Sequence, residues 1–441
     1  MGLDSSEPLA IQGGPKAKRT PFQPRKRHGE REKQLLAEVI DSDVLFFYLG
    51  SKVRELEGRF ASLYGRRYAI ACSSGTAAVH MAVAACRLPP GKEVITSAIT
   101  DMGTVTGMLY QGLIPVFADV DPETLNMDPQ SVRARLSKRT GAIVVVHHAG
   151  LPAALDELLA IGRENGIPVI EDCAQAYGAE HQGRPVGSSG LLSAFSLNHF
   201  KHITCGSGGL VLTDDEKLRY FCSLFLDKCY QREEGLRNPF FLAPNYQMTE
   251  LQAAVALAQL EKLPQFVERR RRLGMRLDEH LRQIPGVTPQ LTPPGCRHSY
   301  FLYLFRLDLS ALDSSAEEFA AALAAEGVPA KARLITGGRP VYLYEIFQRR
   351  SAFPGSEYPF VSRDTGADQR YRQGDCPAAE AAFSCWLTIE MSEHYMETDM
   401  DEFAAGIAKV ARHFARRTAA PPASRTLAGS APGAPAAAPA D

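Results

Sequence analysis

The chain has 441 residues, of which 45% are hydrophobic and 22% charged, and its formal net charge is −1. This balance is ordinary for a globular protein and gives no overall signal for nucleic-acid binding. No apolar run approaches the roughly 18 residues of a membrane-spanning helix. The nine cysteines form no CxxC pair and no metal-type spacing. We therefore expect a cytoplasmic protein with reduced cysteines, no metal site, and neither nucleic acid nor membrane as a partner.

The two ends of the chain differ in composition from the rest. Residues 1–30 are polar and rich in Lys, Arg, Pro and Gly, which predicts an extended N-terminal arm. Residues 416–441 are rich in Ala and Pro. That composition predicts a disordered tail.

Apolar periodicity between the two ends predicts alternating helices and strands. The alternation indicates an α/β domain over residues 31–284, with a mostly parallel sheet between two layers of helices. Beyond residue 284 the pattern changes and predicts a smaller α+β domain over residues 285–415. The expected helices are 30–41, 53–64, 77–86, 249–283, 315–326 and 401–412, and the expected strands are 68–72, 93–97, 114–118, 142–147, 168–171 and 300–307.

Small residues join the first predicted strand to the helix after it, in the sequence Ser73-Ser74-Gly75-Thr76. Small side chains expose the first N–H groups of a helix, and the helix dipole adds about half a positive charge there. This turn is therefore a candidate anion site. A plain helix cap would account for the same residues.

Asp172 ends an apolar segment that is predicted to be a strand. Open α/β sheets present their ligand-binding groups at the carboxyl ends of their strands. Asp172 is thus a candidate ligand-binding carboxylate, with a buried ion pair or a helix cap as the alternative.

Lys201 lies between two strand-like apolar runs, residues 191–195 and 210–212. Burial is costly for a lysine and lowers its pKa. A lysine of this kind is the nucleophile that forms a Schiff base with a carbonyl compound or with pyridoxal phosphate. Pyridoxal phosphate needs such a lysine, an anion cradle for its phosphate, and a carboxylate at its ring nitrogen. The turn at Ser74, Asp172 and Lys201 together match these needs.

The chain resembles the DegT/DnrJ/StrS family of sugar and cyclitol aminotransferases, which depend on pyridoxal 5'-phosphate. The resemblance implies the type I aspartate aminotransferase fold, with a large cofactor-binding domain and a smaller C-terminal domain. The matching stretches are residues 48–57, 74–78, 114–122, 171–176, 206–209, 245–248 and 376–380, together with Ser196 and Lys201.

The resemblance also implies a role for each matching residue. Lys201 would carry the cofactor as an internal aldimine and move the proton, and Asp172 would pair with the pyridine nitrogen; these two are the catalytic candidates. Gln175 would contact the phenolic oxygen. Asn245 would reach the phosphate in a neighbouring subunit, which implies a homodimer with shared active sites. The residues expected at the phosphate are Ser74, Gly75, Thr76 and Ser196.

Some residues depart from the family pattern. Asp101 occupies the place where the family has an aromatic residue that stacks on the cofactor ring, so Asp101 is a candidate cofactor contact, and Met102 is an alternative cover for the ring. His199 is either a proton relay or a surface or packing histidine. His147, in a family motif, is interpreted as structural. We expect substrate contacts near residues 298–300 and 333–344.

The implied function is transfer of an amino group from glutamate or glutamine to a keto-sugar, nucleotide-linked in the favoured case, or to a ketocyclitol. Products of this kind feed amino-sugar, antibiotic or surface-glycan biosynthesis. One alternative is a deoxysugar dehydratase of the same fold, although that branch commonly replaces the lysine with histidine. Another is a non-catalytic regulatory homologue. A Rossmann oxidoreductase is excluded because no GxGxxG follows the first strand.

Overall fold

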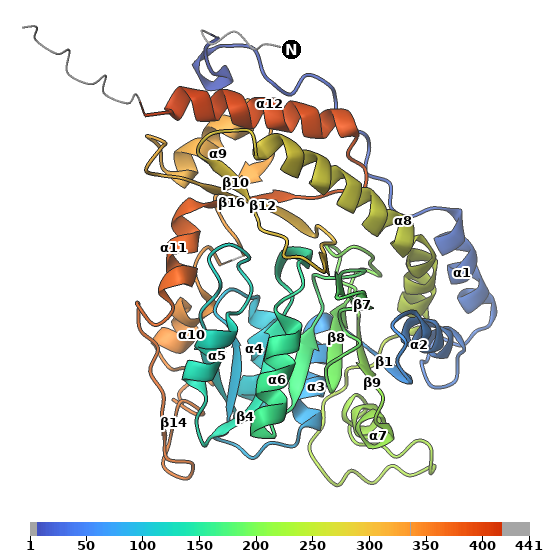
Figure 1. Ribbon diagram of the computed structural model, residues 1–441. Helices are drawn as coiled ribbons and strands as arrows, with labels where there is room; N and C mark the ends of the chain where they lie inside the picture. The colour runs from blue at the N-terminus through green and yellow to red at the C-terminus, as the bar shows by residue number, and fades with distance from the viewer. Residues whose placement is uncertain (1–6, 336, 417–441) are drawn as a thin grey trace, which may run out of the picture.

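The computed structural model describes residues 7–335 and 337–416. Figure 1 shows a larger sheet with its helices below, and a smaller sheet with its own helices above. The long helix α8 (Glu250–Leu281) runs beside both, with α1 (Glu30–Asp41) and α2 (Lys52–Leu63) packed against it.

The larger sheet has seven strands in the order β1-β9-β8-β5-β4-β2-β3. Neighbouring strands from β8 to β3 are parallel, and only β9 runs antiparallel to its two neighbours. The sequence prediction of a mostly parallel sheet is thereby confirmed. The strands are β1 (Tyr68–Cys72), β2 (Glu93–Ser97), β3 (Ile114–Ala118), β4 (Thr140–Val146), β5 (Val169–Asp172), β8 (Leu192–Ser196) and β9 (Gly209–Thr213).

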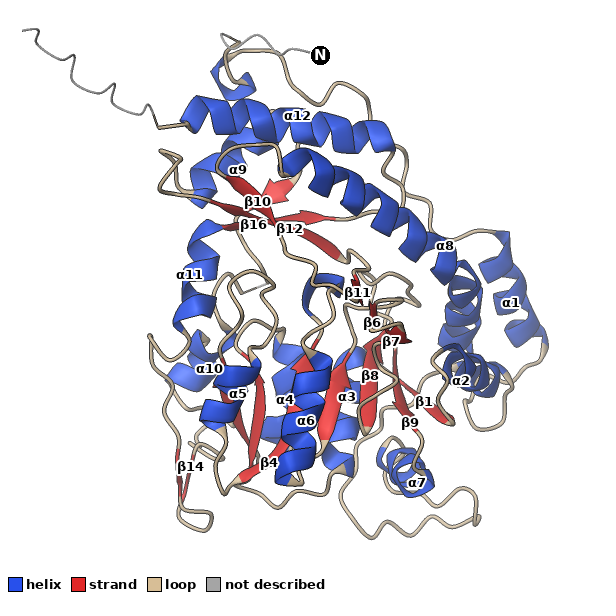
Figure 2. Ribbon diagram, viewed as in Figure 1, coloured by secondary structure: helices blue, strands red, loops and turns tan. Residues whose placement is uncertain are grey.

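Helices cover both faces of this sheet (Figure 2). Alternate residues of a strand point to opposite faces, so Val94 packs with α3 and α4 while Ile95 packs with α5 and α6. The helix α7 joins the first group, and α2 with the start of α8 covers β1, β8 and β9 on the second face. These helices are α3 (Gly75–Ala85), α4 (Met102–Tyr110), α5 (Pro129–Arg135), α6 (Leu155–Asn165) and α7 (Glu216–Phe225).

The smaller sheet is antiparallel, in the order β10-β12-β16-β13. The helices α9 and α12 and the end of α8 pack on it around a separate core that includes Phe305, Phe319 and Phe403. The elements of this layer are β10 (Val287–Pro289), β12 (Leu302–Leu307), α9 (Ala316–Ala325), β13 (Ala330–Lys331), β16 (Trp386–Glu390) and α12 (Glu397–Phe414). The helix α11 (Pro377–Cys385) precedes β16, and its buried residues Ala379 and Ala382 pack into the core of the larger sheet.

The other elements are short. They are the strands β6 (Glu180–His181), β7 (Arg184–Pro185), β11 (Cys296–Arg297), β14 (Val361–Ser362) and β15 (Ala367–Asp368), the helix α10 (Glu345–Gln348), and the 3-10 turns η1 (Ala10–Gln12), η2 (His148–Gly150) and η3 (Val341–Leu343). No helix in the described part of the chain combines the length and apolar character of a membrane span.

Several predicted boundaries are wrong by a few residues. The third helix begins at Gly75 because the Ser74 side chain caps it. The strand expected at residue 300 begins at Leu302, because Tyr300 has a φ of 48°, which no extended strand allows. The last helix begins at Glu397, where Asp399 accepts a hydrogen bond from the Met396 backbone. Nearly all of the predicted tail, residues 416–441, lies outside the described residues.

Candidate active site

A cavity of about 720 Å³ lies between the carboxyl ends of the large-sheet strands and the smaller sheet. The large-sheet side contributes the ends of β4, β5 and β8, the start of α3 and the loop before α4. The predicted catalytic and cofactor-binding residues that line it are Ser74, Gly75, Thr76, Asp101, Asp172, Gln175, Ser196 and Lys201. Most of the predicted site is thus brought together in one place.

The start of α3 forms a candidate phosphate cradle. The Ser74 hydroxyl accepts a hydrogen bond from the Ala77 backbone N–H at 3.0 Å, and this bond fixes the first turn. Gly75 packs against Ser196, and a Cβ atom on Gly75 would lie 2.5 Å from the Ser196 Cβ. The N–H groups of Gly75 and Thr76 belong to the unpaired first turn of the helix. With the helix dipole behind them, they fit a phosphate group.

Asp172 is the last residue of β5 and is only 5% exposed. One carboxylate oxygen accepts a hydrogen bond from the Thr104 hydroxyl at 2.8 Å, and the other accepts the Ala174 N–H at 3.1 Å. The Thr104 hydroxyl also lies 2.7 Å from that of Thr100. Burial raises the pKa of Asp172, although the bond from Thr104 and the charge of Lys201 act in the opposite direction. A carboxylate held in one orientation fits the protonated nitrogen of a bound pyridine ring.

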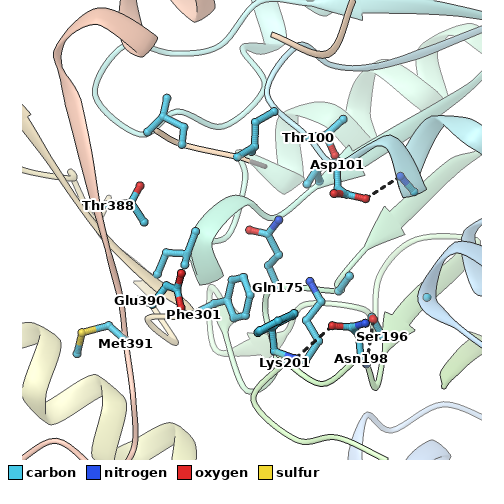
Figure 3. A pocket seen from close by; sticks show the side chains of 18 of the residues that line it. Thr100, Asp101, Gln175, Ser196, Asn198, Lys201, Phe301, Thr388, Glu390 and Met391 are labelled. Atoms are coloured by element: carbon cyan, nitrogen blue, oxygen red, sulfur yellow. Dashed lines mark hydrogen bonds between the residues drawn. The ribbon is translucent and has the colours of Figure 1, made fainter. Parts of the chain in front are cut away.

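Lys201 extends into the cavity beside Gln175 and Phe301 (Figure 3). Its Nζ atom lies 4.7 Å from the centre of the Phe301 ring. Burial lowers the pKa of Lys201, against the opposing charges of Asp172 and Asp101. Within the described residues, no hydrogen bond or ion pair engages Nζ, which therefore fits the covalent attachment of a cofactor aldehyde.

Gln175 and His147 are fixed by neighbouring bonds. The Gln175 side-chain oxygen accepts the Ala149 N–H at 2.8 Å, which leaves the amide NH₂ group for the cavity. In the buried His147 ring, Nδ1 accepts the Ala153 N–H and Nε2 lies 3.1 Å from Glu171. Both ring nitrogens are thus engaged away from the cavity, and the interpretation of His147 as structural is supported.

Glu171 and His147, with Cys173, also form the one cluster of possible metal ligands within the described residues. Glu171 accepts backbone N–H groups from residues 187, 189 and 190 as well as the His147 contact. Burial alone would raise the pKa of Glu171, but the hydrogen bonds from His147 and the backbone lower it. These bonds make the cluster an internal support for the ends of β4 and β5.

Asp101 lines the cavity where an aromatic residue was expected. Its carboxylate caps α4 by accepting the Gly103 N–H at 2.8 Å. Met102 packs into the core and is not a lining residue, so it does not replace the missing aromatic ring. The aromatic side chain beside Lys201 is Phe301, the residue just before β12, which the sequence analysis missed.

Two predicted residues lie away from the cavity of the single chain. His199 is exposed and packs against Phe200, with 5.2 Å between the ring centroids. Asn245 is exposed and forms a β-bridge with Asp227. The relay role of His199 gains no support from this position, and the role of Asn245 toward a second subunit stays a prediction.

The cavity mouth differs in part from the expected substrate region. Arg333 lines it as predicted, but residues 298–300 do not. The N-terminal arm contributes Phe22 and Arg25, which the sequence analysis did not place there. The polar composition of the arm carries no periodic signal that could have located them.

The fold and the residues around the cavity define an aminotransferase of the type I fold. The chain belongs to the DegT/DnrJ/EryC1/StrS aminotransferase family, which it matches over residues 26–407. Enzymes of this family depend on pyridoxal 5'-phosphate. The resemblance inferred from the sequence motifs is thereby confirmed.

Solved structures support the same assignment. The chain is similar to 3-amino-5-hydroxybenzoic acid synthase, with 26% identity and a TM-score of 0.78 over 89% of this chain and 99% of that one. An aminotransferase from Psychrobacter cryohalolentis has 26% identity and a TM-score of 0.78, over 89% and 100%. DesI, solved in the presence of its TDP-sugar product, has 28% identity and a TM-score of 0.74, over 92% and 96%.

Proposed function

We propose that this enzyme moves an amino group from glutamate or glutamine to the ketone of a nucleotide-linked sugar or, as the second class, of a cyclitol. The observation that carries the proposal is the convergence of Lys201, Asp172 and the α3 cradle on one cavity. The proposed setting is amino-sugar, antibiotic or glycan biosynthesis in the cytoplasm, where the nine free thiols would remain reduced.

Bound pyridoxal phosphate supplies an electron sink for the electrons released when a proton leaves the amino-bearing carbon. Asp172 would keep the proton on the ring nitrogen, and its hydrogen bond from Thr104 holds the carboxylate in place. The Lys201 amine would hold the cofactor and would then move the proton, a task for which its lowered pKa suits it. Ser196 and the start of α3 would hold the phosphate, and Asp101, which lines the same cavity at the start of α4, would contact the bound cofactor.

The charge at the cavity mouth supports a nucleotide-linked substrate. Arg25 and Arg333 are exposed lining residues, and within the described residues neither forms an ion pair. Two free guanidinium groups fit a diphosphate. Among the similar structures, DesI was solved with a TDP-sugar product, whereas the benzoic acid synthase makes a product with a carbocyclic ring.

Exposed apolar residues support a homodimer with shared sites. Phe240 is 68% and Leu242 97% exposed, in the loop that leads to Asn245. Apolar side chains gathered on a surface indicate a protein contact. A second copy on this loop would bury them and bring Asn245 toward the neighbouring site.

The proposed domain division is an N-terminal arm over residues 1–30, a large domain over 31–284, a small domain over 285–415 and a tail over 416–441.

The test is a pair of half-reactions followed by absorbance. Purified enzyme loaded with pyridoxal phosphate should lose its cofactor absorption band when glutamate or glutamine is added. Addition of a nucleotide-linked keto-sugar should then restore the band, and the sugar should be recovered as the corresponding amino-sugar. Ketocyclitols tested in parallel separate the two substrate classes. Elimination of water from the sugar without amination would indicate the dehydratase. A protein that takes up no cofactor would indicate the regulatory homologue.

A further inference from the structure

Arg27, in the N-terminal arm, is a buried arginine that holds the backbone of the loop carrying Lys201. Its Nη1 donates to the carbonyl oxygen of His199 at 2.9 Å, and its Nη2 donates to the carbonyl oxygens of Lys201 and His202. The loop connects β8 with β9 and has no helix or strand of its own at these residues. Its inward carbonyl groups therefore need a donor from elsewhere in the chain.

Arg27 is itself fixed by a buried ion network. Its Nε lies 3.1 Å from the Glu393 carboxylate. The same carboxylate accepts hydrogen bonds from the Arg270 Nη2 at 2.6 Å and from the Arg270 Nε at 3.0 Å. These three side chains are at most 5% exposed. Burial lowers the pKa of Arg27 to about 10, and the charge of Glu393 opposes this change. A buried charge is stable only when it stays paired, so the guanidinium has one favourable position.

The backbone of the arm is held at the same point. The side chains of Gln259 and Lys262, on α8, donate to the Arg27 carbonyl oxygen at 2.9 Å and 3.1 Å. In Figure 1 the arm passes from the small-sheet layer to α1 alongside α8. The arm, α8 and the residues before α12 thus meet at Arg27.

We propose that Arg27 is a positioning residue for Lys201, which it keeps at the reacting distance from the cofactor and substrate. This proposal rests on the proposed function of Lys201. A lysine has four rotatable side-chain bonds, so the place of Nζ depends on how firmly its backbone is held. A displacement of about 1 Å at a reacting group can cost about a hundredfold in rate.

Arg66 offers a matched control. It is also buried, at 8% exposure, and it donates to the carbonyl oxygens of Ser188, Gly190 and Leu191 at 2.8 to 3.3 Å. It pairs with Asp214 at 3.3 Å. Arg66 therefore resembles Arg27 in burial, carbonyl partners and ion pairing, but it does not hold the lysine loop.

The experiment compares Arg27→Gln with Arg66→Gln in the full chain. Both variants should melt below the wild type. Only Arg27→Gln should shift the pH titration of the Lys201–cofactor absorption band, reduce the yield of borohydride trapping at Lys201, and lower kcat/KM by about ten- to a hundredfold. Arg27→Lys, which keeps the charge opposite Glu393 and part of the carbonyl contact, should recover part of each loss.

An Arg27→Gln enzyme with the wild-type titration and trapping yield would overturn the proposal, as would equal changes in both glutamine variants. If Arg27→Gln does not fold, the same comparison is made with Arg27→Lys, and a wild-type titration there would overturn it. A wild-type protein without a Lys201–cofactor band would instead refute the proposed function. The two failures are thereby distinguishable.

Discussion

Gly75 and Ser196 lie so close together that a Cβ atom on Gly75 would stand 2.5 Å from the Cβ and 2.7 Å from the hydroxyl oxygen of Ser196. The contact joins the start of α3 to the end of β8. It brings a helix N-terminus and a buried hydroxyl to the same side of the cavity. A glycine is required at this position because real Cβ atoms do not approach so closely.

Gly75→Ala should displace Ser196 and weaken cofactor binding. Overpacking of this kind costs about 1–3 kcal/mol, which corresponds to a rise of about five- to a hundredfold in the dissociation constant if the cost falls on binding. A titration of the cofactor-free protein with pyridoxal phosphate measures the change. Gly58→Ala is the control, because Gly58 lies within α2 and has no atom within 4 Å of the added Cβ. It should bind the cofactor normally, and equal binding by Gly75→Ala would contradict the cradle.

Asp172→Asn should lower the rate of the glutamate half-reaction by at least about a hundredfold, because the amide cannot hold a proton on the ring nitrogen. Thr104→Val removes the hydroxyl that orients Asp172 and should have a smaller effect in the same direction. Thr106→Val is the matched control, since that hydroxyl bonds the Met102 carbonyl on the same helix. Stopped-flow absorbance measures all three. Equal rates for the two valine variants would argue against a role of Thr104.

Glu57 should make the stability of the cofactor-free protein depend on pH. Burial raises the pKa of Glu57 from 4.5 to about 7, although the Ala71 N–H donates to its carboxylate. The folded protein therefore binds more protons than the unfolded chain between these values, and stability falls as the pH rises through this window. Glu57→Gln should remove this pH-dependent loss of stability, which is on the order of 3 kcal/mol across the window. Urea unfolding at several pH values measures it, and an unchanged pH slope in the variant would contradict the assignment.

A shared active site predicts complementation between two inactive variants. Lys201→Ala and Asn245→Ala subunits, unfolded together and refolded, should form mixed dimers in which one site is intact and the other carries both changes. A one-to-one mixture would then recover about a quarter of the wild-type activity, because half of the dimers are mixed and half of their sites work. Activity no greater than the sum of the separate variants would contradict sharing.

Local signals in the sequence located much of the fold and the centre of the site. The strands β1, β2 and β3 have the predicted bounds, because apolar runs between turn residues are a short-range pattern. Asp172 and the Ser74 turn follow such strands, so their places at the sheet edge could be inferred. Lys201 was identified from the apolar runs on either side and from the family motif.

Contacts that depend on tertiary packing were not predictable in this way. Phe301 reaches Lys201 because the chain turns at Tyr300, whose φ of 48° is rare for a tyrosine and has no sequence signature. In the sequence, nothing distinguishes Thr104 from the other small residues of α4. Its hydrogen bond to Asp172, at the end of β5, is seen only in the folded chain. Arg27 is one of several basic residues in a polar arm, and only the folded chain distinguishes it from its exposed neighbours.

The most direct measurement identifies the residue that carries the cofactor. The loaded enzyme is reduced with borohydride, digested, and analysed by mass spectrometry for a peptide that carries the reduced cofactor. Our interpretation predicts the added mass on Lys201 alone, and its loss together with the absorption band in Lys201→Ala. Lys331, the other lysine that lines the cavity, is the internal comparison. Label on Lys331 or another lysine, or an absorption band that survives in Lys201→Ala, would contradict the account.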